Sequence, residues 1–475
     1  MAQSKPAPEM PDFLKKLMGA NQNVICTASM DDVRKVNIDF LLTQRLKIPI
    51  FQRRYCWNVG QWRTLLGDVL NVASRRKTSH SLGRLTCVPE DSSKNARLMV
   101  IDGQQRNTTA ILLLSAIRDI AYNHGDNDGI ALSELINNKI FPDENKEMKQ
   151  WIESYFNTKN QDQGEERGRF IEEGIALKFA CLIPTYCDRS SFYQSILPTN
   201  LPIVSNENEI VKRPQEAKRF FIGELKKKTN EELGLITKAI LFQLEWLFFP
   251  IAMGKNFKDG TEDLHIIFER LALRDAMFCR PTRKNESADM GAADFIRNLL
   301  LGSFYNEDNA IKMYIDHWLP IEKAASNIVL QEGIADVLED MFTHFLDFYS
   351  IKDENEKGGE NNAQPLVPQM IGGMLYARFR AWLIKTNTSN TNTSNTMMKP
   401  PPPSFSSGST TTTGTAAEEE EEGGGGGGEV RAVELTSTEK QTEMILIKLK
   451  MFALDYFDKE KNFSNNQTFM EEGEE

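Results

Sequence analysis

The first 125 residues show short apolar runs that alternate with stretches of helical periodicity. Residues 31–44 place most of their apolar side chains on one side of a helix, and residues 45–50 are typical of a strand. Asn58 suits the N-cap of a second helix, and residues 82–88 and 98–101 are two more predicted strands. A Leu-rich helix follows the last of them. The pattern predicts a small mixed α/β unit.

Beyond residue 129 the spacing of apolar positions becomes mostly helical, with one further strand predicted at 244–252. We therefore expect an α+β protein. In it the mixed unit, at residues 24–128, precedes a mostly α-helical domain at 129–385 that resumes at 430–462. The helix candidates are 172–181, 214–228, 231–243, 264–273, 292–301, 328–348, 372–384 and 439–457.

Three segments differ in composition from the rest of the chain. Residues 1–23 are expected to be a flexible N-terminus, and residues 463–475 an acidic tail. Residues 386–429 run from a Thr/Asn/Ser tract through a Pro run to five consecutive Glu and six consecutive Gly. Because such a composition buries too little apolar surface to offset the entropy of ordering, this segment is predicted to be a disordered insertion.

The charge of the chain is unevenly distributed. The formal net charge is −11, yet the first 125 residues hold 18 basic and ten acidic side chains, a net of +8. The predicted insertion contributes −5 and the tail −4, which leaves −2 for the remainder. The acidic average therefore says little about the folded surface, and the N-terminal unit is the part whose charge favours a polyanion.

Composition also argues against several classes of protein. No run of 18 apolar residues exists, so no membrane partner is expected, and the first residues lack the apolar core of a signal peptide. We expect an intracellular protein, in the cytoplasm or the nucleus. The six Cys include no CxxC pair, which argues against a disulfide framework or a zinc knuckle.

The first candidate for chemistry is segment 100–109, Val-Ile-Asp-Gly-Gln-Gln-Arg-Asn-Thr-Thr. A strand ends, Gly103 permits a sharp turn, and a helix begins, which offers backbone N–H groups and a positive dipole end to phosphate. Arg106 could grip phosphate oxygens, and Asp102 could hold Mg²⁺ or orient an attacking water. Gln104 and Gln105 could position that water or read a base or sugar edge. The equally favoured alternative is a capped turn with its Asp and Arg paired on the surface.

The second candidate is segment 48–57, Ile-Pro-Ile-Phe-Gln-Arg-Arg-Tyr-Cys-Trp, which is basic and aromatic. Gln52 and Arg53 offer hydrogen-bond donors, while Tyr55 and Trp57 offer faces on which a base could stack. The alternative is that Phe51 and Trp57 belong to the core and the two arginines are solvated at its edge. No Walker sequence occurs in the chain, so it is not expected to be a P-loop enzyme.

Together the two segments strongly resemble the N-terminal domain of GmrSD-type restriction endonucleases, a family with a ParB/sulfiredoxin-like fold and a DGQQR signature. The resemblance extends to a Gly-containing strand around Gly83 and to blocks at 267–269, 293–300 and 317–322. Phe51 replaces the family's usual Tyr, Asn107 its usual Leu, and a longer polar loop at 280–290 replaces a short link. The matching motif residues are Ile48, Pro49, Gln52, Arg53, Tyr55, Trp57, Asp102, Gly103, Gln104, Gln105, Arg106, Thr108 and Thr109.

The resemblance implies a unit that binds and hydrolyses a nucleoside triphosphate, with Mg²⁺ held by Asp102. It also implies a sensor in a restriction-like defence system, with DNA as a further partner. By resemblance the catalytic residues are Asp102, Gln104, Gln105 and Arg106. The nucleotide- or phosphate-binding residues are Gly103, Thr108, Thr109, Gln52, Arg53, Tyr55, Trp57 and Gly83.

The family couples this unit to a C-terminal HNH-type nuclease, which needs a general-base His and a metal-ligating His or Asn. The five His of this chain lie at 80, 124, 265, 317 and 344, so we expect no nuclease in cis. A nuclease on a separate subunit and a homo-oligomer are further partner hypotheses. The alternative function is a non-catalytic DNA-binding adaptor that uses the same basic N-terminal face.

Overall fold

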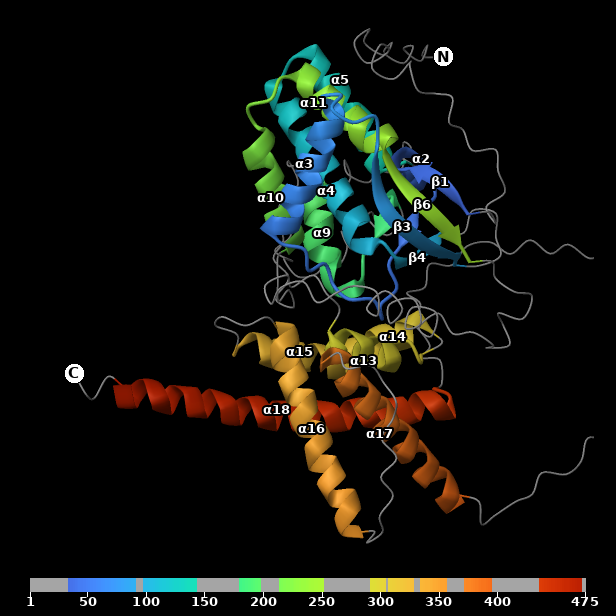
Figure 1. Cartoon of the computed structure of the whole chain (residues 1–475), viewed down its shortest axis with the longest axis vertical. Coiled ribbons are helices and arrows are strands. Elements are labelled where there is room, and N and C mark those ends of the chain that lie inside the picture. The colour runs from blue at the N-terminus through green and yellow to red at the C-terminus, as the bar shows by residue number, and fades with distance from the viewer. Residues whose placement is uncertain are drawn as a thin grey trace, which may run out of the picture.

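The computed structural model describes residues 33–90, 97–142, 179–197, 213–251, 291–304, 306–328, 334–356, 371–394 and 435–471. Its N-terminal part is built on a mixed six-stranded sheet, and its C-terminal part is helical (Figure 1). The predicted α+β class is confirmed, while the closer likeness to the ParB/sulfiredoxin fold stays a prediction. Across the described residues, no helix combines the length and the apolar composition that a membrane span requires.

The sheet draws its strands from distant parts of the chain. They are β1 (Arg34–Asn37), β2 (Leu46–Lys47), β3 (His80–Pro89), β4 (Leu98–Asp102), β5 (Leu182–Ile183) and β6 (Leu244–Pro250). Their order is β1-β6-β3-β4-β2-β5. β6 is antiparallel to β1 and parallel to β3, and β4 is antiparallel to β3. β2 lies parallel to both β4 and β5. The strands predicted at 82–88, 98–101 and 244–252 are therefore confirmed as β3, β4 and β6.

The prediction for residues 31–44 was wrong in its first half. Residues 34–37 form β1, because Val36 is buried in register with Trp246 of β6. The helix α2 (Ile38–Thr43) begins only after Asn37, whose side chain caps it by accepting a hydrogen bond from Phe40 N at 2.9 Å. Local spacing suggested one long helix, whereas pairing with a strand more than 200 residues away decides the outcome.

Helix α4 forms the centre of the N-terminal part. It starts directly after β4 and is buried along most of its length, packed against α5, α10 and α11. Figure 1 shows these helices gathered on one side of the sheet. The helical elements here are α3 (Val59–Ala73), α4 (Gln104–His124), α5 (Asn127–Ile140), η2 (Tyr186–Asp188), α9 (Arg189–Ile196), α10 (Arg213–Leu225), α11 (Asn230–Lys238) and η3 (Ala239–Gln243).

The sheet and its apolar core extend past the boundary predicted at residue 128. Strands β5 and β6 complete the sheet, and the core around α4 includes side chains from Val36 to Phe248. The mixed unit therefore takes in described segments that were assigned to the helical domain. The expected N-cap is confirmed, because Asn58 begins α3 and accepts a hydrogen bond from Gly60 N at 2.9 Å.

The C-terminal helices build a second apolar core. This core also includes Ile50 and Phe51 of the second motif segment, Val88 of β3 and Ile101 of β4. Strands β3 and β4 therefore contribute side chains to both cores. The helices are α13 (Ala292–Leu301), α14 (Glu307–Met313), η5 (Tyr314–Trp318), α15 (Leu319–Ser326), α16 (Ile334–Glu356), α17 (Ile371–Ser394) and α18 (Ser437–Glu471).

Several expectations fall on residues that the structure does not describe. These are the N-terminus at 1–23, the helix candidate 264–273 and most of the candidate 172–181. Of the predicted insertion, residues 395–429 lie outside the described residues, while 386–394 continue α17 instead of starting a disordered segment. Helix α18 likewise runs to Glu471, into the stretch predicted as an acidic tail.

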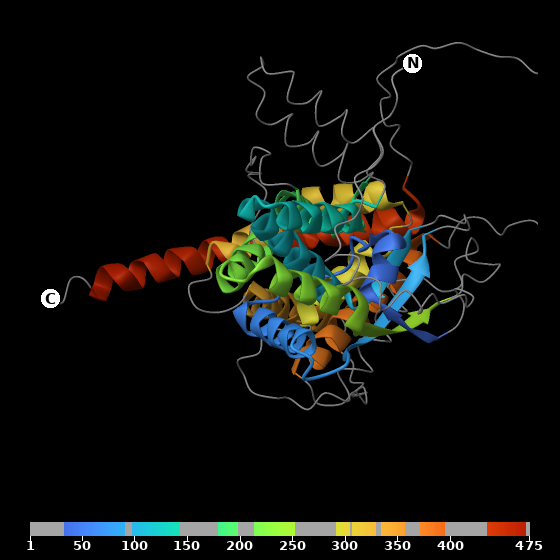
Figure 2. The same ribbon diagram turned by 90° about the horizontal axis from the view of Figure 1, so that it is seen from above.

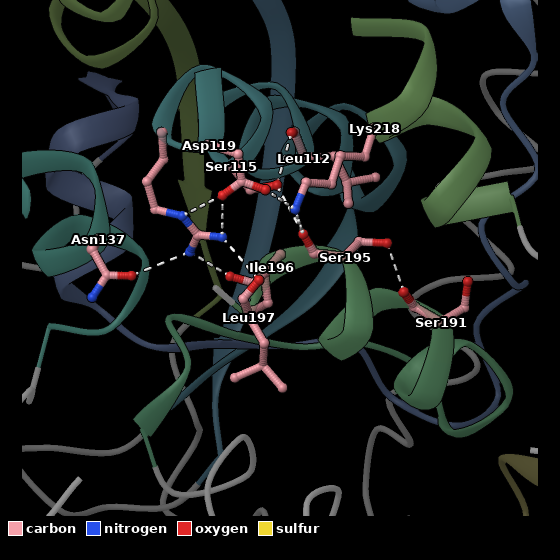
Figure 3. A network of polar contacts seen from close by, with 10 residues as sticks. Leu112, Ser115, Asp119, Asn137, Ser191, Ser195, Ile196, Leu197 and Lys218 are labelled. Carbon is pink, nitrogen blue, oxygen red and sulfur yellow. Dashed lines mark hydrogen bonds and ion pairs between the residues drawn. The ribbon is translucent and has the colours of Figure 1, made fainter. Parts of the chain in front are cut away.

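A buried ionic cluster ties α4 to its neighbours (Figure 3). Arg118 donates to Asp119 Oδ1 from Nε at 2.9 Å and Nη2 at 2.8 Å, while Lys218 of α10 lies 2.5 Å from Asp119 Oδ2. Arg118 also donates to the carbonyls of Ile196 and Leu197, which end α9 and follow it. One carboxylate is therefore shared by two basic side chains, and together they join α4, α9 and α10.

Candidate functional site

The junction of β4 and α4 requires glycine at position 103. Gly103 has a φ of 98°, in the left-handed region, and a Cβ there would lie 2.8 Å from Leu85 Cδ1 and 3.2 Å from the Trp246 ring. The backbone can therefore turn sharply between the strand and the helix. Helix α4 begins here with no side-chain hydrogen bond to cap it. A helix N-terminus attracts anions through its first N–H groups and its dipole. Here Gly103, Gln104 and Gln105 are buried, and Arg106 is the exposed residue of the first turn.

Asp102 ends β4, and its side chain is 40% exposed. Its carboxylate pairs with Arg84 of β3, whose Nε and Nη2 each lie 3.4 Å from Asp102 Oδ2. The surface pair considered for this junction therefore exists, but its cation is Arg84 and not Arg106. Arg84 was missed in the sequence, although its position next to Gly83 in the Gly-containing strand was a usable signal.

Arg106 is exposed on the first turn of α4. Its Nη1 donates to Leu82 O at 2.6 Å, and its guanidinium lies 5.8 Å from the centre of the Trp246 ring. Gly83 makes this possible, because a Cβ at that position would come within 2.9 Å of Arg106 Nη1. Gly83 also has a φ of 86°, which disfavours other residues. Glycine at position 83 therefore allows the Arg106 side chain to pass across β3.

Gln104 and Gln105 are buried and hold the second motif segment. Gln104 Nε2 donates to Gln52 Oε1 at 3.1 Å, and Gln52 Nε2 donates to Ile101 O at 2.9 Å. Gln105 Nε2 donates to Arg54 O at 3.0 Å, and its Oε1 accepts from Cys56 N at 3.0 Å. The three glutamines therefore use their amides internally. We expected these glutamines to position a water or contact a nucleotide, but their amides bond to the protein itself. We therefore assign them the role of positioning the main chain of the second motif segment.

Tyr55, Thr108 and Thr109 are also buried and satisfied internally. Tyr55 Oη lies 2.7 Å from Thr109 Oγ1 and accepts from Trp62 Nε1 at 2.8 Å. Burial raises the pKa of Tyr55 well above its ordinary value. Both threonine hydroxyls donate back to α4, Thr108 to Gln104 O and Thr109 to Gln105 O. The stacking face predicted on Tyr55 is therefore inaccessible.

The remaining residues of segment 48–57 divide between core and edge. Phe51 is buried in the second core, which confirms the alternative that placed it there. Trp57 is half-buried against the first core. Arg53 is half-buried and lies near Asp294 of α13. Burial raises the pKa of the Asp294 carboxyl, and the positive charge of Arg53 opposes this rise. Of this segment, Arg53, Arg54, Cys56 and Trp57 are half-buried, and the other residues are buried.

Arg54 connects the motif segment to the C-terminal helices. It forms an ion pair with Glu322 of α15, whose carboxylate also accepts from Tyr314 Oη and Trp318 Nε1, each at 2.9 Å. Arg297 of α13 lies 3.9 Å from the same carboxylate. Burial alone would raise the pKa of Glu322, but the two arginines and these hydrogen bonds hold it below its ordinary value.

Asp188 belongs to the same buried cluster. Its Oδ2 accepts from Tyr55 N at 2.6 Å. Burial raises the pKa of Asp188 to about 6, although that hydrogen bond and the cations of Arg54 and Arg297 act in the opposite direction. The main chain of the motif segment is thus held by an acidic side chain from η2 on one side and by Gln105 on the other. Glu322 lies in the family-like block 317–322, but the local sequence around it and around Asp188 does not predict these contacts.

The described residues contain no group of three or more His, Cys, Asp or Glu that could by itself hold a metal ion. Mg²⁺, however, commonly binds through one or two carboxylates together with substrate phosphates and waters. Asp102 is a partly exposed carboxylate beside an uncapped helix start, with Arg84 and Arg106 nearby. These residues fit Mg²⁺ that arrives with a phosphate ligand.

A partly exposed aspartate and two arginines lie around the start of α4 in this α+β domain. Residues 38–271 match the family described as GmrSD restriction endonuclease, N-terminal domain. This part of the chain is therefore a GmrSD N-terminal domain, and the resemblance drawn from the two motif segments is confirmed. No curated protein matches the chain.

Proposed function

We propose that the GmrSD N-terminal domain of this chain binds a nucleoside triphosphate at the junction of β4 and α4. The observation that carries the proposal is the uncapped first turn of α4, flanked by Asp102, Arg84 and Arg106. Two guanidinium groups and a helix dipole attract a polyphosphate. The domain itself is a module of restriction endonucleases.

The proposed roles follow from exposure. Arg106 and Arg84 contact phosphate oxygens, and Asp102 is the residue that holds Mg²⁺, which would neutralise the charge that develops on the phosphates. When a nucleotide with Mg²⁺ separates Arg84 from Asp102, the guanidinium and the carboxylate both become available to bind it. Gln52, Gln104, Gln105 and Tyr55 act indirectly, because they position the main chain around the junction.

The second motif segment connects the proposed site to the C-terminal helices. Gln105 holds Arg54 O, and the side chain of Arg54 pairs with Glu322 of α15. We propose that nucleotide binding is coupled through this segment to the helical part, as a sensor requires. A nuclease on a separate subunit and the sensing of modified DNA stay predictions.

The test is hydrolysis by the Asp102→Ala variant. We expect the wild-type chain to release phosphate from at least one of the four ribonucleoside triphosphates with Mg²⁺, assayed with and without modified DNA. Asp102→Ala should lower that rate about 100-fold or more, the usual size of loss when an electrostatic stabiliser is removed. Asp68→Ala, another partly exposed carboxylate beside a basic side chain, serves as the control and should leave the rate unchanged.

Two results would count against this proposal. One is the absence of phosphate release by the wild-type chain with every nucleotide, combined with no rise in its unfolding temperature when Mg²⁺ and nucleotide are added. The other is an Asp102→Ala variant that hydrolyses as fast as Asp68→Ala. A rise in unfolding temperature without hydrolysis would support binding and remove the enzymatic part of the proposal.

A second candidate function, a DNA-binding adaptor, is favoured by one specific feature. Arg75, Arg76 and Lys77 follow α3 and are all exposed, whereas Arg53 is half-buried. If this cluster contacts DNA phosphates, changing all three to Ala should weaken binding and flatten the dependence of log affinity on log salt concentration. Fluorescence anisotropy with labelled duplex DNA at several salt concentrations measures both. Asp102→Ala is the control and should bind DNA as the wild type does. If log affinity falls with log salt concentration equally steeply for the triple variant and the wild type, the adaptor function is contradicted.

A further inference from the structure

Helix α18 has two apolar faces. One packs into the second core and includes Ile445, Leu446, Leu449, Ala453 and Phe457. The other is solvent-exposed and consists of Met444 (50% exposed), Ile447 (38%), Met451 (69%) and Leu454 (37%). At 3.6 residues per turn the two faces lie roughly 160° apart. We call the four exposed side chains the α18 stripe.

The α18 stripe has the spacing of a coiled-coil seam. Its positions follow one another by three, four and three residues, which is the alternation of a and d positions in a heptad repeat. An exposed helix face in a monomer normally carries polar residues at these positions. Four large apolar side chains in a continuous row therefore indicate a surface that is covered by another helix.

We propose that the α18 stripe pairs in parallel with the same stripe of a second copy of this chain. A two-fold axis along the pair would bring Met444 against Met444 and Met451 against Met451 of the second copy. Figure 1 shows α18 lying across the C-terminal helical part, on the side of α13 and α15 away from the sheet. Figure 2 shows the C-terminal end of α18, which lies beyond the α18 stripe, extending past the other elements.

Charges beside the α18 stripe favour the second copy and the parallel orientation. With Met444 at an a position, Glu443 and Lys450 occupy g positions, and Lys448 and Asp455 occupy e positions. In a parallel pair, g faces the e position five residues further along the partner helix. Glu443 then meets Lys448 of the second copy, and Lys450 meets Asp455. Both contacts join opposite charges. In an antiparallel pair centred on the stripe, Lys450 would face Lys450.

Existing contacts of these charged residues are compatible with the pairing. Lys450 Nζ donates to Asp316 O at 2.8 Å, and Asp455 pairs with Lys459 at 2.7 Å. An ammonium group has three donors and a carboxylate has two oxygens, so each can serve a second partner.

The seam is short, but α18 is already ordered by its other face. An isolated helix with two heptads would lose much of the association energy in becoming helical. Here the helix is held against α15, α16 and η5 before any partner arrives. Preorganisation of this kind lowers the cost of association.

The test compares the same substitution at two equally exposed isoleucines. The full chain should have a molar mass near twice 54.0 kDa by light scattering after size exclusion at micromolar concentration. Ile447→Glu should give the mass of one chain, because it places a carboxylate in the seam. Ile130→Glu, on α5 and also 38% exposed, should stay dimeric. Far-UV circular dichroism and unfolding temperature show that both variants are folded.

Three outcomes overturn the pairing. They are a wild-type chain with the mass of one copy, an Ile447→Glu variant that stays dimeric, and an Ile130→Glu variant that becomes monomeric while folded. A monomeric wild type whose α18 stripe is protected from hydrogen exchange and methionine oxidation would mean that another segment of the same chain covers it.

Orientation is tested by disulfide cross-linking. Met444→Cys and Leu454→Cys should each cross-link to themselves under mild oxidation, above the level that the six native Cys give in the wild type. If instead only a mixture of the two variants cross-links, the pair is antiparallel and the parallel arrangement is overturned.

Discussion

Replacing Glu322 by Gln is expected to lower the free energy of unfolding by about 3–5 kcal/mol. The reason is that Arg54 and Arg297 share this carboxylate in a buried setting, and the side chain of Glu322 is only 5% exposed. Removing one partner of a buried ion pair leaves an uncompensated charge, and this costs more than the pair itself contributes. Urea denaturation followed by circular dichroism measures the change.

The Glu322→Gln result needs a matched comparison. Glu216→Gln removes an exposed carboxylate that pairs with Arg213 at 3.2 Å within one helix, and it should change stability by less than about 1 kcal/mol. A double variant, Glu322→Gln with Arg54→Met, should recover part of the loss, since one stranded cation is gone. A loss below about 1 kcal/mol for Glu322→Gln would show that the cluster is hydrated or that other acids balance it.

The second large effect is expected at Asp119. Asp119→Asn should also destabilise the fold by about 3–5 kcal/mol, because Arg118 and Lys218 would then lie buried with no shared anion. Burial and the neighbouring Arg118 already lower the pKa of Lys218, while Asp119 opposes them. Loss of the carboxylate therefore favours a neutral Lys218, and the destabilisation should be smaller at pH 10 than at pH 7. Denaturant titrations at both pH values measure this.

Controls for Asp119→Asn separate charge from packing. Asp347→Asn breaks an exposed pair with Arg378 and should have an effect of less than about 1 kcal/mol. Lys218→Met removes one cation and leaves Arg118 paired with Asp119, so it should cost less than Asp119→Asn. If Asp119→Asn lowers the free energy of unfolding equally at pH 7 and pH 10, deprotonation of Lys218 does not reduce the destabilisation.

Asp119 and Glu322 lie in different parts of the fold and connect different elements. Asp119 joins helices within the N-terminal core, whereas Glu322 joins the motif segment to the C-terminal helices. The Asp119 variant should therefore lower stability without changing which nucleotide binds. The Glu322 variant alters the residues that hold Arg54, and hence the segment next to the proposed phosphate site.

Much of the local structure was predictable. Strands β3, β4 and β6, the N-cap at Asn58 and helix α13 at 292–301 agree with the predictions. These elements combine regular apolar spacing with clear boundary residues, which local patterns report well. The junction around Gly103 was also predicted, because only glycine tolerates the backbone conformation that a sharp turn from strand to helix imposes.

The site was only partly predictable. Which of the polar motif residues face solvent depends on where the second motif segment packs, and that is set by contacts between distant residues. Gln104 and Gln105 were expected at the ligand, yet they bond to Gln52, Arg54 and Cys56. Arg84, which was not expected, is the partner of Asp102.

The amino-acid sequence by itself determined the family of the N-terminal domain, the turn at Gly103 and the helices and strands with regular apolar spacing. Only the tertiary structure decided that β6 lies between β1 and β3, that Glu322 balances Arg54, and that α18 exposes a second apolar face. The physical reason is that helical and strand periodicity arises between neighbours a few residues apart. Strand order, ion pairing and burial depend on groups hundreds of residues away, about which the local pattern carries no information.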